Sequence, residues 1–301
     1  MKWKIFCLKI LMTYIKKLKG NYMTLNEIIK SNDFEFKKKF GQNFISDTNL
    51  LNSIVSDAEI TSSDEVLEIG VGAGTLTKIL SNNASKVVGI EIDKELEKIH
   101  EITLADTKNV KVIFDDFMSL SSEFINSQFS KPFKVVANLP YYITTPIIFK
   151  LLEEDFNIVS LTLMVQKEVA ERLISKQGSK DYGAITVQLN SIADVKLKRI
   201  VGRQMFSPVP NVDSAIIKID IDRNKFQIDN FKLHKQLIKV AFSMRRKTLS
   251  NCLKSGFGLL ASQIEELFNN CSLDLNVRGE SLSISQFVML SNELNKINLN
   301  K

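Results

Sequence analysis

The chain has 301 residues, of which 44% are hydrophobic and 25% charged, and its formal net charge at pH 7 is +6. This composition indicates a folded globular protein and excludes disordered and fibrous classes. Three scattered cysteines and two histidines argue against a disulfide scaffold, a zinc site and a His-dependent nucleophile, and they predict a cytoplasmic protein.

Residues 1–22 contain six lysines and no acidic residue, so this segment accounts for the whole net charge. Its lysines interrupt the apolar residues too often for a membrane span or a signal peptide, and we expect no stable membrane partner. On a helix the segment is amphipathic and basic, as in membrane-surface or targeting helices. The favoured alternative is that residues 1–22 are not translated and that Met23 is the initiator, because nothing later in the chain requires them.

Strand-like and helix-like patterns alternate between about Glu65 and Lys167. The predicted strands are EVLEIG, KVVGIEI, VKVIF, FKVVANL and LTLMVQK. Strands joined by crossover helices form right-handed βαβ units, which predicts an α/β fold with a Rossmann-like, mostly parallel sheet and helices on both faces. Ligands bind such sheets at the carboxyl ends of the strands.

The pattern changes after this sheet. YGAITVQLN predicts a helix, VKLKRIV and SAIIKIDI predict strands around the turn FSPVPNVD, and the rest is helical with breaks at Ser255-Gly256 and near Gly279. The polar stretch 220–230 is the predicted linker. We therefore expect an extension at 1–22, an α/β domain at 23–222 and a small helical C-terminal domain at 223–301.

The segment VLEIGVGAGTL places Gly70, Gly72 and Gly74 between a strand and a helix. Such glycines let the backbone approach a ligand and present helix N-terminal N–H groups to it. Glu91 ends the next strand, where a carboxylate accepts hydrogen bonds from ribose hydroxyls. The spacing G-x-G-x-G, with Glu68 ahead of it, is the form associated with S-adenosylmethionine enzymes rather than nicotinamide enzymes. A tight turn without a ligand is the structural alternative.

Two aspartates, Asp115 and Asp116, follow the third predicted strand. One of them is placed to accept a hydrogen bond from an adenine amino group. The alternative for either residue is an N-cap of the following helix, because a carboxylate there accepts hydrogen bonds from backbone N–H groups. These residues alone leave the choice between the two open.

The segment ANLPYYITTPI ends the fourth predicted strand. Asn138 offers a side-chain carbonyl, Leu139 a backbone carbonyl ahead of Pro140, and Tyr141 a flat ring. Methyl transfer to an exocyclic amino group requires two such acceptors, because they hold the hydrogens of the nitrogen and favour a pyramidal geometry that aims its lone pair. The ring can stack on a base that has left its helix.

Together these segments resemble the KsgA family of ribosomal RNA adenine dimethyltransferases, relatives of the Erm methylases. The resemblance runs from Asn26 to about Ser291 and departs from the family in VGAG, where PGxG is frequent. The segments that carry it are KKKFGQNFISD, EIGVGAG, IEID, FDDFM, NLPYY, MVQKEVAERL, KDYG, FSPVPNVDS and FSMRRKTLSN. The family has a Rossmann-like methyltransferase sheet and a helical C-terminal domain that contacts RNA.

The resemblance implies S-adenosyl-L-methionine as cofactor and a role in ribosome biogenesis. The reaction would be dimethylation of two adjacent adenosines near the 3′ end of small-subunit ribosomal RNA in an immature small subunit, carried out by a monomer without a metal. The implied cofactor-binding residues, with Asp116 selected by the D-x-M pattern, are Gln42, Asn43, Ile45, Gly70, Glu91, Asp116 and Asn138. The implied catalytic residues, with Phe206 covering the face of the base opposite Tyr141, are Asn138, Leu139, Pro140, Tyr141 and Phe206.

RNA binding is predicted from local basic runs, because the chain after residue 22 has no net charge. Four of the seven arginines lie in these runs, and arginine forms forked contacts with phosphate. The alternatives are a solvated surface or ion pairs within the chain. The candidate RNA-binding residues are Lys37, Lys38, Lys39, Arg199, Arg203, Arg245, Arg246 and Lys247.

Three other functions remain as alternatives. An Erm-type methylase of large-subunit RNA shares the chemistry, but the long C-terminal region and FSMRRKTLSN argue against it. A mainly non-catalytic ribosome-assembly factor would not need the complete set of Gly70, Glu91, Asp116 and Asn138. A nicotinamide oxidoreductase is disfavoured by NLPY and by the scarcity of histidine.

Overall fold

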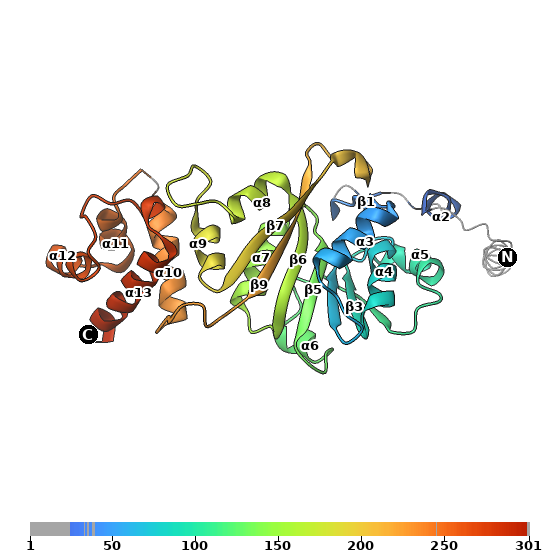
Figure 1. The fold of residues 1–301 in the computed structure, drawn as a ribbon, viewed down its shortest axis with the longest axis horizontal. Coiled ribbons are helices and arrows are strands. Elements are labelled where there is room, and N and C mark those ends of the chain that lie inside the picture. Colours follow the sequence, from blue (N-terminus) through green and yellow to red (C-terminus); the bar gives the residue numbers. More distant parts are fainter. Residues whose placement is uncertain (1–24, 33, 35, 38–39, 245, 300–301) are drawn as a thin grey trace. The chain divides into compact units, whose positions relative to one another are not determined.

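The computed structural model describes residues 25–299 except 33, 35, 38–39 and 245 (Figure 1). The predicted extension at 1–22 lies outside the described residues. Contacts divide the chain into two compact units. The first unit consists of the chain up to Val165 together with Ile200–Ile216, and the second unit consists of Gln166–Arg199 together with Ile217–Lys301. The domain boundary expected between residues 222 and 223 stays a prediction.

A seven-stranded sheet has the order β4-β3-β2-β5-β6-β9-β7. Strand β2 pairs in parallel with β3 and β5, β3 pairs in parallel with β4, and β5 with β6. This arrangement confirms the predicted α/β sheet. The strands are β2 (Glu65–Ile69), β3 (Lys86–Glu91), β4 (Val110–Phe114), β5 (Phe133–Asn138), β6 (Ile158–Gln166), β7 (Ala193–Val201) and β9 (Ser214–Ile221).

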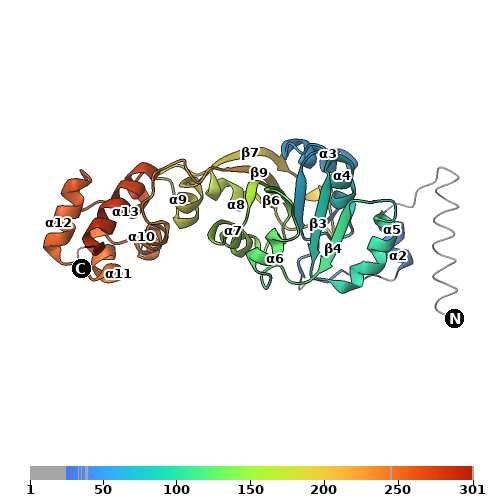
Figure 2. The same cartoon turned by 90° about the horizontal axis from the view of Figure 1, so that it is seen from below.

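Helices cover both faces of the sheet in the first unit. Helices α3 and α4 share a buried core with one face, formed by side chains such as Ile54, Leu80, Val66 and Val136, while α6 and α7 lie on the opposite side (Figure 2). Alternate strand residues point to opposite faces, and because helices cover both faces, nearly all residues of β2, β3 and β5 are buried or half-buried. The helices are α2 (Leu25–Ser31), α3 (Thr48–Asp57), α4 (Thr75–Asn83), α5 (Glu97–Thr103), α6 (Ser122–Asn126) and α7 (Thr144–Glu153).

The chain changes direction across the sheet between β2 and β5. It runs outward from β2 to β3 and β4, then returns to place β5 on the other side of β2. The crossover connections on the two sides of this point diverge, and a crevice opens at the carboxyl ends of the two strands. The glycine turn after β2 and Asn138 at the end of β5 meet there.

The second unit is mainly helical and has its own core, in which Leu237, Leu253, Phe268 and Phe287 are fully buried. The break predicted near Gly279 is confirmed by a short 3-10 helix, η4 (Gly279–Ser281). Among the described residues, no helix has the length and apolarity to cross a membrane. The helices are α8 (Lys167–Leu173), α9 (Ala184–Asn190), α10 (Phe231–Ser243), α11 (Leu249–Phe257), α12 (Ala261–Asn270) and α13 (Ile284–Leu299).

The break predicted at Ser255-Gly256 is wrong. Helix α11 continues through both residues to Phe257, and Gly258 ends it in the left-handed conformation with φ of 65°. The N–H of Gly258 donates to the carbonyl of Lys254 at 3.1 Å, which satisfies one of the last carbonyls of the helix. Gly256 and Gly258 lie close together in the sequence, and the helix ends at the second of them.

Candidate active site

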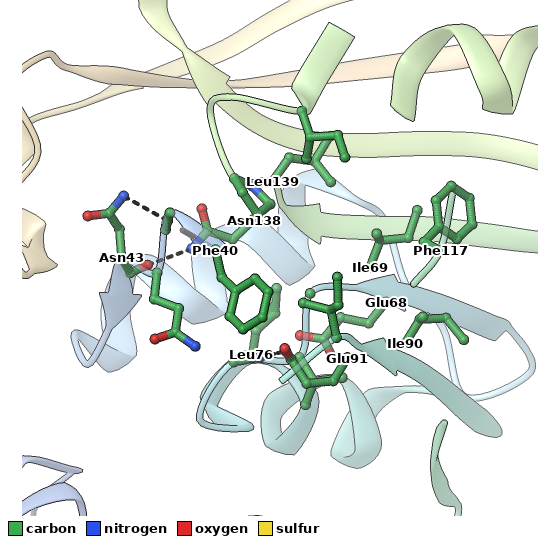
Figure 3. A pocket seen from close by; sticks show the side chains of 18 of the residues that line it. Phe40, Asn43, Glu68, Ile69, Leu76, Ile90, Glu91, Phe117, Asn138 and Leu139 are labelled. Carbon is green, nitrogen blue, oxygen red and sulfur yellow. Dashed lines mark hydrogen bonds between the residues drawn. The ribbon is translucent and has the colours of Figure 1, made fainter. Parts of the chain in front are cut away.

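A cavity of about 290 Å³ lies at the carboxyl ends of β2, β3, β4 and β5. Five chain segments line it, and Figure 3 shows side chains from several of them converging on the same space. The predicted site residues that the structure brings together here are Gln42, Asn43, Ile45, Gly70, Glu91, Asp116, Asn138, Leu139, Pro140 and Tyr141.

The glycine turn between β2 and α4 depends on left-handed backbone at Gly70, Gly72 and Gly74, whose φ angles are 80°, 57° and 81°. A Cβ added at Gly74 would lie 2.9 Å from the Thr103 hydroxyl, and one at Gly72 would lie 3.2 Å from the Phe44 ring. The turn therefore excludes side chains for both conformational and steric reasons.

His100 supports this turn from α5, a role that the sequence did not reveal. Its Nε2–H donates to the carbonyl of Gly72 at 2.7 Å, since a carbonyl can only accept. Burial lowers the pKa of His100 below its usual value, so the ring stays neutral at pH 7. A lone histidine in a helical pattern gives no sign of such a long-range contact.

Glu91 at the end of β3 is held by two backbone donors. The N–H of Gly72 donates to Oε2 and the N–H of Asp93 to Oε1, both at 2.8 Å. Burial raises the pKa of Glu91, and these two hydrogen bonds oppose the increase. The carboxylate therefore has a defined orientation at the edge of the cavity.

Glu68 is the acidic residue that precedes the glycine turn, and it is 1% exposed. Its Oε2 atom is buried and has no hydrogen-bond partner in the described part of the chain. Burial, together with the nearby Glu91, raises the pKa of Glu68 to about 8. At pH 7 Glu68 is therefore mostly a neutral acid, and an added positive charge nearby would favour its ionised form.

Asp115 and Asp116 both line the cavity after β4. Asp116 accepts a hydrogen bond from the N–H of Met118 at 2.9 Å, whereas Asp115 is exposed and accepts from the N–H of Asp116 at 2.8 Å. Both carboxylates therefore have a local turn-forming role as well as a position at the cavity.

Asn138 lies at the carboxyl end of β5, where its Nδ2 donates to the carbonyl of Asn43 at 3.0 Å (Figure 3). This hydrogen bond points the carboxamide nitrogen toward Asn43 and leaves the carboxamide oxygen to accept a hydrogen bond from a ligand. The hydroxyl of Tyr141 forms a hydrogen bond of 2.6 Å with that of Ser214, which is fully buried. Ser214 was not identified from the sequence, although it is the last residue of FSPVPNVDS.

Phe206 is 3% exposed and is absent from the residues that line the cavity. It lies opposite Ile45 in a two-stranded sheet formed by β1 (Phe44–Ile45) and β8 (Phe206–Ser207). This pairing joins the segment before α3 to FSPVPNVDS. Its role against the target base stays a prediction.

The candidate RNA-binding residues differ in their surroundings. The ammonium of Lys37 forms ion pairs with Asp93 and Glu95 at 2.7 and 2.9 Å. Arg199, Arg203, Arg246 and Lys247 are exposed. Lys38, Lys39 and Arg245 lie outside the described residues.

A second cavity, of about 400 Å³, lies in the second unit and contains Arg246. Arg278 also lines it and was not identified from the sequence, because it stands alone between neutral and acidic residues. The lining residues are Gly178, Ser179, Lys180, Arg246, Arg278 and Glu280.

The sequence is similar to curated proteins over most of its length. A ribosomal RNA small subunit methyltransferase A from Clostridioides difficile (strain 630) is 41% identical over 280 residues, covering 92% of this chain and 96% of that protein. The protein of the same name from Streptococcus thermophilus (strain ATCC BAA-491 / LMD-9) is 40% identical over 287 residues, covering 93% of this chain and 99% of that protein.

Solved structures support the same relationship. A dimethyladenosine transferase from Plasmodium falciparum superimposes with a TM-score of 0.71 at 29% identity, covering 85% of this chain and 98% of that one. The 23S rRNA methyltransferase ErmE superimposes with a TM-score of 0.64 at 25% identity, covering 84% of this chain and all of that one. The family model described as ribosomal RNA adenine dimethylase matches residues 33–296. The chain therefore belongs to the ribosomal RNA adenine dimethylase family.

Proposed function

We propose that this protein uses S-adenosyl-L-methionine to dimethylate the exocyclic amino groups of two adjacent adenosines near the 3′ end of small-subunit ribosomal RNA. The observation that carries the proposal is the Asn138 carboxamide, whose nitrogen is bound to Asn43 and whose oxygen remains available at the cavity. The two relatives that are named small subunit methyltransferases, at 40% identity or more, support this RNA as the substrate.

Three observations support S-adenosylmethionine as the ligand of this cavity. The left-handed glycine turn leaves room for a ligand beside the backbone, and Glu91 presents an oriented carboxylate for ribose hydroxyls. The buried Glu68 oxygen, which has no hydrogen-bond partner among the residues that the structure describes, suits a positively charged ligand. Asp116 would accept from the adenine amino group. When bound, this cofactor supplies a methyl group that its sulfonium makes electrophilic. The residues proposed to hold it are Gln42, Asn43, Ile45, Gly70, Glu91, Asp116 and Asn138.

The proposed catalytic residues act on the target amino group. The Asn138 oxygen and the Leu139 carbonyl would accept hydrogen bonds from the N–H groups of that nitrogen. These hydrogen bonds reduce the delocalisation of its lone pair into the base and aim the lone pair at the methyl carbon, and the nitrogen releases one proton to water for each methyl group it gains. Tyr141 stacks on the base, and Ser214 fixes its ring through the hydroxyl contact of 2.6 Å. Pro140 holds this loop, and Phe206 is proposed to cover the other face of the base.

RNA binding is proposed for the basic residues of both units. The second cavity supports this, because two arginines and a lysine converge there around a single glutamate. Forked guanidinium contacts with phosphate would position the RNA without reading its sequence. The proposed residues, including those outside the described part, are Lys37, Lys38, Lys39, Arg199, Arg203, Arg245, Arg246 and Lys247.

The proposed partner is an immature small ribosomal subunit in the cytoplasm, bound by a monomer without a membrane partner. The Erm-type alternative has a structural relative in ErmE, but the proteins of about 40% identity carry small-subunit names. A role in ribosome assembly is compatible with catalysis by the same residues.

The proposal is tested by incubating the protein with labelled S-adenosylmethionine and immature small subunits, followed by mass spectrometry of the RNA. We expect dimethyladenosine at two adjacent positions near the 3′ end. Absence of dimethyladenosine would contradict the enzymatic proposal, and its appearance only in large-subunit RNA would favour the Erm-type alternative.

A further inference from the structure

We infer that Asp93 is a positioning residue that anchors Lys37 and the segment 40–45, hereafter the cofactor loop, and thereby orients the Asn138 carboxamide. This inference rests on the proposed function, since it concerns how the same site is held together. Asp93 lies two residues after Glu91 and is absent from the residues that line the cavity. It therefore acts through other residues rather than by touching a ligand.

The two carboxylate oxygens of Asp93 bind Lys37 and the cofactor loop. Oδ1 accepts from the ammonium of Lys37 at 2.7 Å, and Oδ2 accepts from Nε2 of Gln42 at 2.8 Å. Gln42 in turn accepts from the backbone N–H of Lys37 at 2.7 Å through its Oε1. These three hydrogen bonds close a network among Asp93, Lys37 and Gln42.

In the ion pair between Asp93 and Lys37, the Asp93 side chain is the more deeply buried partner. The Asp93 side chain is 2% exposed, and the Lys37 side chain is 23% exposed. Burial by itself raises the pKa of Asp93, but hydrogen bonds from Lys37 and Gln42 outweigh it and hold that pKa below its usual range. A charged, buried acceptor with good geometry gives strong hydrogen bonds, and removing it takes away the acceptor of Gln42 Nε2 and leaves Lys37 with only the exposed Glu95.

Asp93 also connects this network to the proposed ribose-binding acid. Its backbone N–H donates to Oε1 of Glu91 at 2.8 Å, while its side chain holds the cofactor loop. One residue thus fixes the carboxylate on one side of the cavity and the loop on another. A shift of Asp93 would move both.

Beyond Gln42, the cofactor loop reaches the catalytic groups within three residues. The carbonyl of Asn43 accepts from Asn138, and the carbonyl of Ile45 accepts from the Thr75 hydroxyl at 2.9 Å. Ile45 also pairs with Phe206 across the β1–β8 ladder. The position of the loop therefore determines which end of the Asn138 carboxamide faces the cavity.

Lys37 has a contact within the chain in addition to the RNA-binding role proposed for it. Its place in a basic run predicts a phosphate contact, and the structure also pairs its ammonium with two acids. Glu95 provides a natural comparison, because its side chain is 68% exposed and bonds Lys37 but not Gln42. Exposed pairs of this kind contribute little, so Asp93 carries the anchor.

The experiment compares Asp93→Ala with the control Glu95→Ala. Binding of S-adenosylhomocysteine is measured by titration calorimetry, and the single-turnover methylation rate is measured at saturating cofactor. For Asp93→Ala we expect a Kd raised by about tenfold, from the loss of charged hydrogen bonds. We also expect a single-turnover rate lowered by about 100-fold, from misplacement of Asn138. Glu95→Ala should stay within about twofold of the unchanged protein in both.

Hydrogen exchange of peptides covering 40–45 separates a loop effect from global unfolding. We expect faster exchange there in Asp93→Ala, with unchanged exchange in the peptide covering 284–297 of α13. If Asp93→Ala fails to fold, Lys37→Met replaces it, and Lys37→Arg should restore cofactor binding by keeping the ion pair.

Equal Kd and rate in Asp93→Ala and the unchanged protein would overturn the inference. A raised Kd with a normal rate at saturating cofactor would overturn the link to Asn138. If Lys37→Met loses only RNA affinity, Lys37 binds RNA and does not anchor the cofactor loop, which would also overturn the inference. Failure of the unchanged protein to bind S-adenosylhomocysteine or to methylate RNA would instead contradict the proposed function.

Discussion

Single hydrogen bonds determine what the candidate site can do. The carboxamide of Asn138 has a donor nitrogen and an acceptor oxygen, and the nitrogen donates a hydrogen bond to the Asn43 carbonyl. Reversing the carboxamide would point its nitrogen toward the target amino group, where two donors would face each other. The chemistry therefore depends on a backbone carbonyl that does not itself touch the substrate in the proposal.

We expect Asn138→Ala to lower the methylation rate by on the order of 100-fold, as for loss of one preorganised polar contact in an active site. Asn138→Asp should be similarly impaired, because its second oxygen would face the Asn43 carbonyl. RNA affinity, measured by filter binding, should remain within about twofold for both variants, since the phosphate contacts that dominate RNA affinity are unchanged. Asn83→Ala, at an exposed asparagine on α4, is the matched control. A fully active Asn138→Ala variant would refute the role of the carboxamide.

At the scale of elements, the strands and helices of the first unit follow from their sequence patterns. Continuous β-branched runs and a glycine turn are local signals, and β2, α4 and β3 form where these signals predicted them. The end of α11 was misplaced because Gly256 and Gly258 both satisfy the pattern for a helix end. Only the left-handed φ at Gly258 distinguishes them.

The connection between α10 and α11 carries Arg246 and Lys247, both of which are exposed. We expect the double variant Arg246→Ala, Lys247→Ala to bind small-subunit RNA more weakly and to reduce the slope of log affinity against log salt by about two, because each lost phosphate contact removes roughly one released counterion. The measurement is RNA binding at several salt concentrations.

A charge-matched control for this variant is available on α8, where Lys167 and Arg172 form exposed ion pairs with Glu171 and Glu168. The double variant Lys167→Ala, Arg172→Ala removes the same number of positive charges. An equal change in salt slope for both double variants would show a general charge effect and would contradict a specific contact at Arg246 and Lys247.

At the scale of the whole molecule, stability should depend on the protonation of His234. This residue on α10 is fully buried, and its two ring nitrogens each lie 3.0 Å from a serine hydroxyl, that of Ser191 after α9 and that of Ser291 on α13. Burial lowers the pKa of His234 from 6.5 to about 4. The neutral ring thus joins three parts of the second unit.

We expect the free energy of unfolding to decrease as the pH falls from about 6.5 to about 4. In this range the unfolded chain binds a proton on His234 that the folded chain does not, so acid favours unfolding, by about 3 kcal/mol over the whole interval. The measurement is denaturant unfolding at several pH values for the unchanged protein and for His234→Gln. Parallel pH profiles for the two proteins would contradict the prediction.

The sequence by itself determined the alternation of strands and helices between Glu65 and Lys167, the glycine turn, the acid that follows it and the NLPY segment, because each depends on residues that are near neighbours in the chain. Only the tertiary structure decided which groups orient the site. Lys37 and Asp93 are 56 positions apart, and Asn43 and Asn138 are 95 apart. Such contacts depend on where the sheet places the ends of β3 and β5 relative to the cofactor loop. Because no local pattern encodes these distances, the basic run at Lys37 predicted an RNA contact but gave no sign of the pairing with Asp93.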